Sequence, residues 1–221
     1  MSILDRISIA RGTDKSSICH NYCNKYEKYF PFKRYEKLNI LEIGVLDGQS
    51  LRVWKEYFFN SNILGIDITK ECKQYEEERI RVEIGSQTDG EFLKKIIQEY
   101  GPFDIILDDG SHINSDVIYS FEHLFESVKP GGIYVIEDSC TSYWPNWGGD
   151  RYKKGTSIEY FKEKVDEVNF FGEYNENPER GVFDRRDEDI IKQFKEKGYQ
   201  YIGIEFESLN FLNGIIIITK R

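Results

Sequence analysis

Short apolar runs alternate with amphipathic stretches along most of the chain. Runs such as Asn39–Val45 and Phe103–Asp108 are apolar at nearly every position, which is typical of strands that are buried on both faces. Glu91–Tyr100 instead spaces its apolar residues at helical intervals and is followed by Gly101-Pro102, a helix stop signal. This alternation predicts an α/β domain in which helices cover both faces of a mostly parallel sheet.

Seven strands and five helices are expected from these runs. The expected strands are Asn39–Val45, Asn62–Ile68, Arg79–Ile84, Phe103–Asp108, Ile133–Glu137, Tyr201–Phe206 and Leu212–Thr219. The expected helices are Thr13–Phe30, Leu51–Phe58, Glu91–Tyr100, Ser115–Val128 and Asp187–Glu196. The last two strands lie too close together for a helical crossover, so we expect them to form an antiparallel hairpin at one edge of the sheet.

Length and composition narrow the class of protein. A chain of 221 residues suffices for one domain, so we expect residues 1–221 to form a single unit with a helical N-terminal segment, 1–37, and an insertion or lid, 139–186. The net charge of −9 disfavours nucleic acid as a partner. No apolar run approaches the roughly 20 residues that span a bilayer. Without a signal peptide, and with four cysteines in no CxxC pair, a cytoplasmic location is expected.

Polar residues and glycines gather where five of the expected strands end. Ligands of open α/β sheets bind outside the carboxyl ends of the strands, so these residues are candidate ligand contacts. They are Glu42, Gly44, Asp47 and Gly48 after the first strand, Asp67 after the second, Ser86 and Gln87 after the third, Asp108, Asp109 and His112 after the fourth, and Glu137 and Asp138 after the fifth.

The turn after the first strand favours a nucleoside cofactor without a pyrophosphate. A dinucleotide fingerprint is G-x-G-x-x-G, but Glu42 stands where its first glycine would be. A carboxylate there suits the cationic amino-acid end of S-adenosylmethionine, and Asp67 can accept the ribose hydroxyls. Ser86, Gln87 and Asp108 are further candidate contacts to this cofactor. A dinucleotide remains the alternative.

Three carboxylates at two neighbouring strand ends predict a metal site. Asp109, Glu137 and Asp138 would repel one another unless a cation neutralised them. Ligands that are all oxygen favour Mg²⁺, or another hard divalent cation, over zinc. His112 could then act as a general base beside the catalytic Asp109. The alternative is a solvated strand end, with Asp109 capping a helix and His112 in a structural role.

Aromatic residues follow the candidate ligands directly. Tyr143, Trp144 and Trp147 could stack on the apolar face of a sugar ring, or could anchor their loop in the core. Arg151, Lys153 and Lys154 come next; a solvated basic loop explains them more simply than contact with a diphosphate.

The motifs together resemble the metal-dependent sugar O-methyltransferases of macrolide biosynthesis, the mycinamicin and macrocin type. They are LEIGVLDGQSL, GIDI, IGSQTD, DDGSH and KPGGIYVIEDSCTSYWP, and GTDKSSICHNYCNKYEKYF resembles the start of that family's catalytic domain. The resemblance covers roughly residues 11 to 150. It implies the Rossmann-like fold of class I methyltransferases, S-adenosylmethionine as methyl donor, Mg²⁺ at Asp109, Glu137 and Asp138, and His112 as the base.

The resemblance also implies a reaction: O-methylation of a sugar hydroxyl on a glycan, a nucleotide sugar or a glycosylated natural product. A cell-surface polysaccharide sugar fits as well as a macrolide, because we expect no further N-terminal domain of the kind that larger relatives carry. Two alternatives stay open, a methyltransferase for catechols or phenols and a non-catalytic protein that binds S-adenosylmethionine. The sequence does not decide between a monomer and a homo-oligomer.

Overall fold

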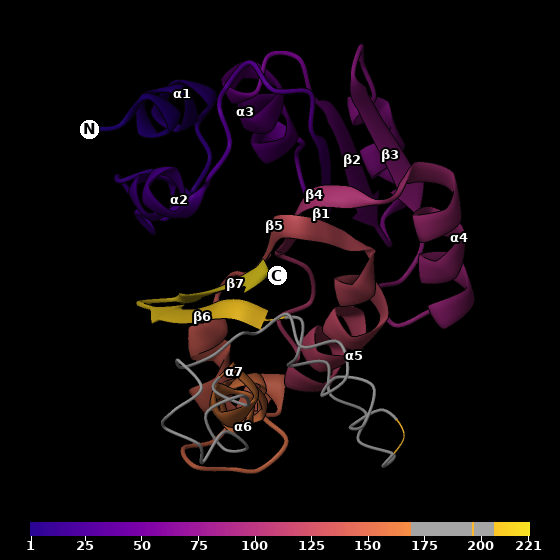
Figure 1. The fold of residues 1–221 in the computed structure, drawn as a ribbon. Helices are drawn as coiled ribbons and strands as arrows, with labels where there is room; N and C mark the ends of the chain where they lie inside the picture. The colour runs from indigo at the N-terminus through magenta and orange to yellow at the C-terminus, as the bar shows by residue number, and fades with distance from the viewer. Residues whose placement is uncertain (169–195, 197–205) are drawn as a thin grey trace, which may run out of the picture.

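The computed structural model describes residues 1–168, 196 and 206–221, and a seven-stranded sheet runs through its middle (Figure 1). The strands are β1 (Asn39–Ile43), β2 (Asn62–Asp67), β3 (Ile80–Ile84), β4 (Phe103–Asp108), β5 (Val128–Ile136), β6 (Phe206–Leu212) and β7 (Ile215–Lys220). Their order is β3-β2-β1-β4-β5-β7-β6. β7 pairs antiparallel with β5 and β6, and the other pairs are parallel. The predicted α/β fold with a C-terminal antiparallel hairpin is confirmed.

Helices cover both faces of this sheet (Figure 1). The α-helices are α1 (Ile3–Arg11), α2 (Cys23–Tyr29), α3 (Gln49–Tyr57), α4 (Gly90–Tyr100), α5 (Asn114–Leu124), α6 (Ser157–Glu163) and α7 (Val165–Val168). The 3-10 helices are η1 (Lys70–Tyr75), η2 (Phe125–Ser127), η3 (Ser139–Tyr143) and η4 (Pro145–Trp147). Apolar residues of α1, α2 and α3 share one core cluster with the sheet, and those of α4, α5 and α6 share the other.

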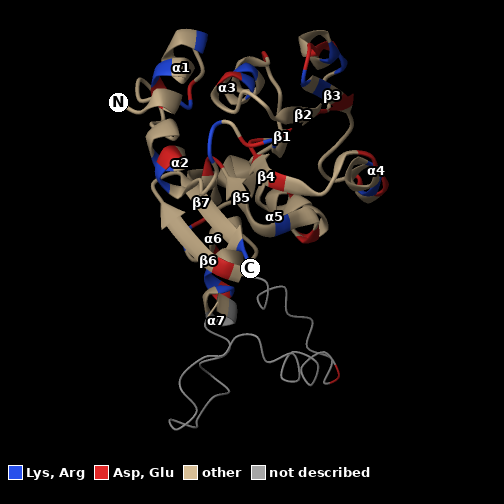
Figure 2. Cartoon of the chain, turned by 45° about the horizontal axis from the view of Figure 1, so that its top comes forward, with Lys and Arg blue, Asp and Glu red and all other residues tan. Residues whose placement is uncertain are grey.

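Side-chain alternation along the central strands explains the two cores. In β4, Ile105 and Leu107 belong to the cluster beneath α1–α3, whereas Ile106 belongs to the cluster on the other face. All three are fully buried, which is why the strand reads as a continuous apolar run. In Figure 2, Lys, Arg, Asp and Glu lie mainly on helices and loops, whereas the strands are mostly uncharged. An exception is Asp108, which ends β4.

The strands and the turn of the hairpin lie at different residues from those predicted. Strand β6 spans Phe206–Leu212, where a turn is predicted, and the predicted strand Tyr201–Phe206 lies almost wholly outside the described residues. The turn itself is Asn213-Gly214, with Gly214 at φ +80°. Asn-Gly is a strong signal for a two-residue hairpin, and the glycine adopts the positive φ of the second turn position at little cost. Strand β7 therefore begins only at Ile215.

The N-terminal segment also differs from its prediction. The expected helix Thr13–Phe30 forms only over Cys23–Tyr29, as α2, and its first half is wrong. A separate helix, α1, begins after the capping residue Ser2 and ends at Gly12, which adopts the left-handed conformation at φ +76°. Residues 13–22 form turns, and α2 starts only at Cys23. Glycine ends the first helix because its missing side chain makes positive φ inexpensive. The turns carry the chain across the carboxyl ends of the strands.

The remaining predictions concern the C-terminal half. β5 starts at Val128 rather than Ile133, because the register with β4 shifts between Phe103 and Ile105 and lets Lys129–Gly132 bulge out. In the predicted insertion 139–186, the structure describes residues 139–168, which include η3, η4, α6 and α7. Residues 169–186 and the expected helix Asp187–Glu196, except Glu196 itself, lie outside the described residues. None of the described helices has the length and apolar content that crossing a bilayer requires.

Candidate functional site

A cavity of about 480 Å³ opens at the carboxyl ends of β1 and β2. Its lining comes from the turn after β1, the end of β2, the loop after β4 and the N-terminal turns. The residues are Gly12, Thr13, Asp14, Lys15, Gly44, Val45, Leu46, Asp47, Ser50, Asp67, Thr69, Cys72, Asp109, Gly110, His112 and Asp138. The structure thus brings predicted residues from four strand ends to one hollow. Gly48 does not line it, but caps α3 at φ +72° and so closes the turn.

Asp67 lines this cavity and is held in place by backbone amides. Its Oδ2 accepts hydrogen bonds from the backbone amides of Val45 and Leu46 at 2.8 and 3.3 Å, and its Oδ1 accepts one from Thr69 at 2.8 Å. Burial alone would raise the pKa of Asp67, but these amide hydrogen bonds outweigh it and lower the pKa. The carboxylate is therefore ionised, fixed in place, and able to accept further donors from a ligand.

A second cavity of about 440 Å³ adjoins the first and shares Gly44, Asp67, Thr69 and Gly110 with it. Ser86 and Gln87, predicted as cofactor contacts, both line this second hollow. The side chain of Gln87 is anchored, because its Oε1 accepts from the amide of Ser111 at 2.8 Å. Together the two cavities form an extended trough across the ends of β1, β2 and β3.

Glu42 and Asp108 have a different placement from the one that the sequence predicts. Both are buried and line neither of these two cavities. Glu42 Oε2 accepts from the indole of Trp54 at 2.9 Å, and burial raises the pKa of Glu42 to about 7. Asp108 accepts from Ser120 at 2.5 Å, and burial likewise raises its pKa to about 6. Each is bonded within the protein, below the cavity wall.

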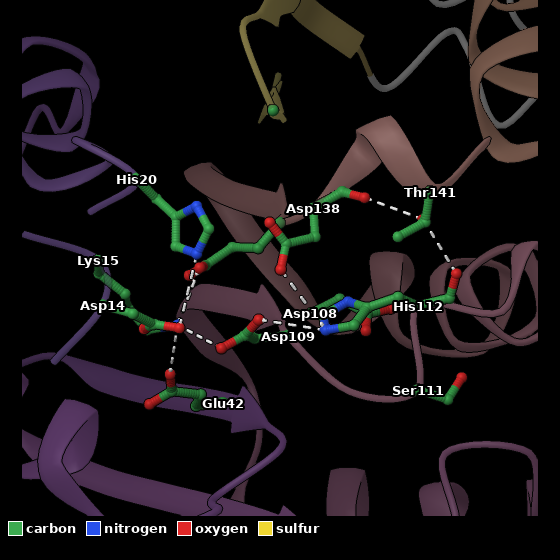
Figure 3. A network of polar contacts seen from close by, with 12 residues as sticks. Asp14, Lys15, His20, Glu42, Asp108, Asp109, Ser111, His112, Asp138 and Thr141 are labelled. Atoms are coloured by element: carbon green, nitrogen blue, oxygen red, sulfur yellow. Dashed lines mark hydrogen bonds and ion pairs between the residues drawn. The ribbon is translucent and has the colours of Figure 1, made fainter. Parts of the chain in front are cut away.

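Asp109, His112 and Asp138 converge on one point (Figure 3). His112 Nε2 lies 3.8 Å from Asp109 Oδ1 and 3.7 Å from Asp138 Oδ2. All three side chains are about a quarter exposed, so they remain accessible to a ligand. His112 and Asp138 also have positive φ, +57° and +47°, which is costly for residues other than glycine and tends to occur at functional sites.

A buried lysine lies behind this group. Lys15 donates to Asp109 Oδ2 and, at 2.8 Å, to Glu137 Oε2, and its Nζ is 3.4 Å from Glu42 Oε1 (Figure 3). Burial alone would lower the pKa of Lys15, but the three carboxylates outweigh it and raise the pKa well above its usual value. The lysine therefore stays charged. One ammonium thus contacts three carboxyl groups, Glu42, Asp109 and Glu137.

The predicted ligand Glu137 is not part of the open group. It is 2% exposed and lies instead among Glu42, Asp109 and Lys15. Its Oε1 has no hydrogen-bond partner among the described residues, and burial together with Asp109 raises its pKa. A buried carboxylate oxygen without a donor is costly, and a cation would relieve that cost. The carboxylate oxygens of Asp109 and Asp138, which stay accessible beside His112, fit a hard divalent cation.

A third cavity, of about 380 Å³, lies on the far side of His112 and Asp138. Its lining includes Trp144 and Trp147, whose rings meet edge to face at a centroid distance of 5.3 Å. Tyr143 lines none of the three cavities and is 49% exposed. His112 and Asp138 line both the first and third cavities, so they stand between the trough and the tryptophans.

Two residues of the site escape sequence analysis. Lys15 and Tyr22 were expected on one helix, but the turns of residues 13–22 bring both to the carboxylates, and Tyr22 donates to Asp138 Oδ1 at 2.6 Å. The only signal was the GTDK run that carries the resemblance. By contrast, the side chains of Arg151, Lys153 and Lys154 are exposed and line none of the three cavities. This agrees with the prediction of a solvated basic loop.

The amino-acid sequence is similar to those of known methyltransferases. No protein-family model matches the chain. The chain is 42% identical over 175 residues to mycinamicin VI 2''-O-methyltransferase of Micromonospora griseorubida, an alignment that covers 75% of this chain and 44% of the relative. It is 44% identical over 145 residues to demethylmacrocin O-methyltransferase of Streptomyces fradiae, covering 62% of this chain and 36% of the relative.

A solved structure is similar over almost the whole chain. It is the MycE methyltransferase in complex with Mg, S-adenosylhomocysteine (SAH) and mycinamycin VI, with a TM-score of 0.82 and 33% identity. The match covers 99% of this chain and 53% of that one. The chain thus spans less than half the length of the two curated relatives above and about half of the solved one.

Proposed function

Since the chain belongs to the class I methyltransferases and is a homologue of the macrolide sugar O-methyltransferases, we propose that it transfers a methyl group from S-adenosylmethionine to a sugar hydroxyl. A bound divalent cation, Mg²⁺ or a similar ion, assists the transfer. The acceptor is a sugar carried on a glycan, a nucleotide or a natural product. The names of the relatives support O-methylation of a sugar, and the Mg and SAH in the MycE complex support the cation and the methyl donor.

One observation carries this proposal: His112 and Asp138 line two cavities at once. The trough over β1 and β2 has the strand-end position, the glycine turn and the fixed Asp67 that suit a nucleoside cofactor. The cavity with Trp144 and Trp147 offers aromatic faces of the kind that pack against sugar rings. A methyl group passing from one cavity to the other would cross the Asp109, His112 and Asp138 group.

The reaction forms a bond between the acceptor oxygen and the methyl carbon, and breaks the bond from that carbon to the sulfonium sulfur. A divalent cation, when bound, supplies Lewis acidity that makes a neighbouring hydroxyl easier to deprotonate. Asp109 and Asp138 would hold the cation, and His112 Nε2 would take the hydroxyl proton. The fixed walls around them hold donor and acceptor in line, which contributes on the order of 7–11 kcal/mol in well-oriented reactions.

His112→Asn separates a role as base from a role as metal ligand. Asparagine tolerates the positive φ of this position, so the backbone should be retained. We expect turnover to fall by about 10²-fold, the lower range for loss of a general base, with no change in the Mg²⁺ concentration that gives half-maximal rate. Steady-state kinetics over a Mg²⁺ series measures both quantities. His123→Asn on α5 is the matched control, and a raised Mg²⁺ requirement would make His112 a ligand.

The whole proposal is tested with labelled S-adenosylmethionine and a panel of acceptors. We expect methyl transfer to a nucleotide sugar, a deacylated glycan or a glycosylated natural product, and its loss when EDTA removes the divalent cation. Scintillation counting of the separated product measures transfer, and added Mg²⁺ should restore it. Efficient methylation of a simple catechol, with none of the sugars, would favour the phenol-directed alternative. Binding of S-adenosylmethionine without transfer to any acceptor would favour the non-catalytic one.

A further inference from the structure

The N-terminal turns hold two carboxylates of the candidate metal site by one oxygen each. Lys15 donates to Oδ2 of Asp109, and Tyr22 donates to Oδ1 of Asp138 at 2.6 Å. The oxygens left over, Asp109 Oδ1 and Asp138 Oδ2, are the ones that lie within 3.8 Å of His112 Nε2. Each carboxylate thus has one oxygen engaged by the N-terminal turns and the other directed at the open group.

We propose that Lys15 and Tyr22 are positioning residues, which orient Asp109 and Asp138 so that their free oxygens can bind the divalent cation together. This inference rests on the proposed function and adds to it a role for the segment 12–22. Partners that hold a metal ligand by its second atom fix the ligand's orientation, and their removal typically costs 10–100-fold in metal affinity. Here both partners come from one short stretch of chain.

That stretch is itself held in place. The Lys15 carbonyl accepts from the amide of Cys23 at 3.0 Å, and Asp5 Oδ1 accepts from the amide of Ser17 at 2.6 Å. The Tyr22 hydroxyl also lies 3.2 Å from the carbonyl oxygen of Gly214 in the β6–β7 turn. Lys15 is 2% exposed, so its ammonium cannot turn to solvent without opening the segment. The donors are fixed before any ligand arrives, as a positioning role requires.

Lys15 also separates two candidate cation sites. Glu42, Asp109 and Glu137 form a second group with the spacing of metal ligands, but the Lys15 ammonium lies among them. Without Lys15, Asp109 and Glu137 would repel each other and turn apart. With it, Asp109 stays directed at Asp138. Lys15 therefore supports the open group by filling the inner one.

The test measures binding of Mn²⁺ alone, from the EPR signal of the free ion, in the full chain. We expect Tyr22→Phe and Lys15→Met to weaken Mn²⁺ binding at least about 10-fold, while Tyr22→Phe changes S-adenosylmethionine affinity less than threefold. The Mg²⁺ concentration for half-maximal methyl transfer should rise in parallel for Tyr22→Phe. A purely structural role would not raise that concentration. Tyr22→Phe removes only a hydroxyl, so the test stands even if Lys15→Met does not fold.

Two matched controls remove the same kinds of bond elsewhere. Tyr100→Phe deletes a tyrosine–carboxylate bond of 2.7 Å to Glu83, and Lys129→Met deletes a lysine–carboxylate bond of 2.8 Å to Asp104. Both should bind Mn²⁺ like the wild type. If Tyr22→Phe bound Mn²⁺ with the same affinity as the wild type, the positioning role of Tyr22 would be refuted. Tighter binding, or a second ion, in Lys15→Met would show that Lys15 competes with the cation. Wild-type protein that binds no Mn²⁺ would overturn the metal site itself.

Discussion

Asp109→Asn should lower metal-dependent methyl transfer by on the order of 10³-fold, which corresponds to about 4 kcal/mol of transition-state stabilisation. Asp109 Oδ1 belongs to the open group beside His112, and an amide oxygen lacks the charge that attracts a hard divalent cation. Lys15 would keep its bond to Glu137, so the fold should be little affected. Steady-state rates with labelled S-adenosylmethionine, with and without Mg²⁺, give the effect.

A retained cofactor site distinguishes this result from unfolding. S-adenosylmethionine affinity, measured by calorimetry, should stay within about threefold of the wild type, because Asp67 and the turn after β1 are untouched. Glu91→Gln, an exposed acid-to-amide change on α4, is the matched control and should keep full activity. If Asp109→Asn turned over within threefold of the wild type and still required Mg²⁺, the ion would have to bind elsewhere.

The order and the type of most elements could be predicted from the sequence, because the central strands are buried on both faces. Burial on both faces makes a strand such as Phe103–Asp108 continuously apolar, and such a run stands out against amphipathic helices. The hairpin register could also have been predicted from Asn213-Gly214, whose turn preference is local. The extent of β5 could not, because its first residues pair with β4 only through a bulge.

The candidate site was predictable only as far as strand ends determine it. Asp109 and Asp138 follow neighbouring strands, so their meeting follows from topology alone. Which of two adjacent acids faces the cavity is harder, because successive residues point to opposite faces. Asp108 accordingly points to Ser120 on α5, and Asp109 points to the open group. The same alternation directs Glu137 inward and leaves Asp138 about a quarter exposed beside the cavity.

Lys15 shows where local reasoning ends. Its partners Asp109 and Glu137 are 94 and 122 positions away in the chain, so no periodicity or spacing near residue 15 indicates them. The local pattern favoured a helix through this position, which would have left the lysine on a solvated face. Gly12 instead ends α1, and the following turns bury the ammonium. A long-range ion pair of this kind appears only when the sheet is assembled.

Gly44→Ala should be the most destabilising small substitution at the site. Gly44 has φ +90°, and a Cβ there would overlap the backbone carbonyl oxygen of Asp109. Its amide donates to Ile66 at 2.9 Å, while the Asp109 amide donates to Ile43 at 3.0 Å, so the ends of β1, β2 and β4 cannot easily separate. The left-handed backbone costs about 1–2 kcal/mol for alanine, and overpacking typically adds 1–3 kcal/mol. We expect a loss of roughly 2–5 kcal/mol in the free energy of unfolding.

Gly131→Ala separates the two contributions, because Gly131 has φ +76° but open space where a Cβ would go. Gly131→Ala should reduce the free energy of unfolding only by the backbone cost of about 1–2 kcal/mol, and so lower Tm by about 2–8 °C. Gly44→Ala should lower Tm by about 4–20 °C. Gly44 also lines both halves of the trough, so S-adenosylmethionine affinity should fall at least about 10-fold in Gly44→Ala alone. Equal Tm losses in the two variants would mean that the β1 and β4 ends do not approach as closely as described, and the cofactor trough would lose its shape with them.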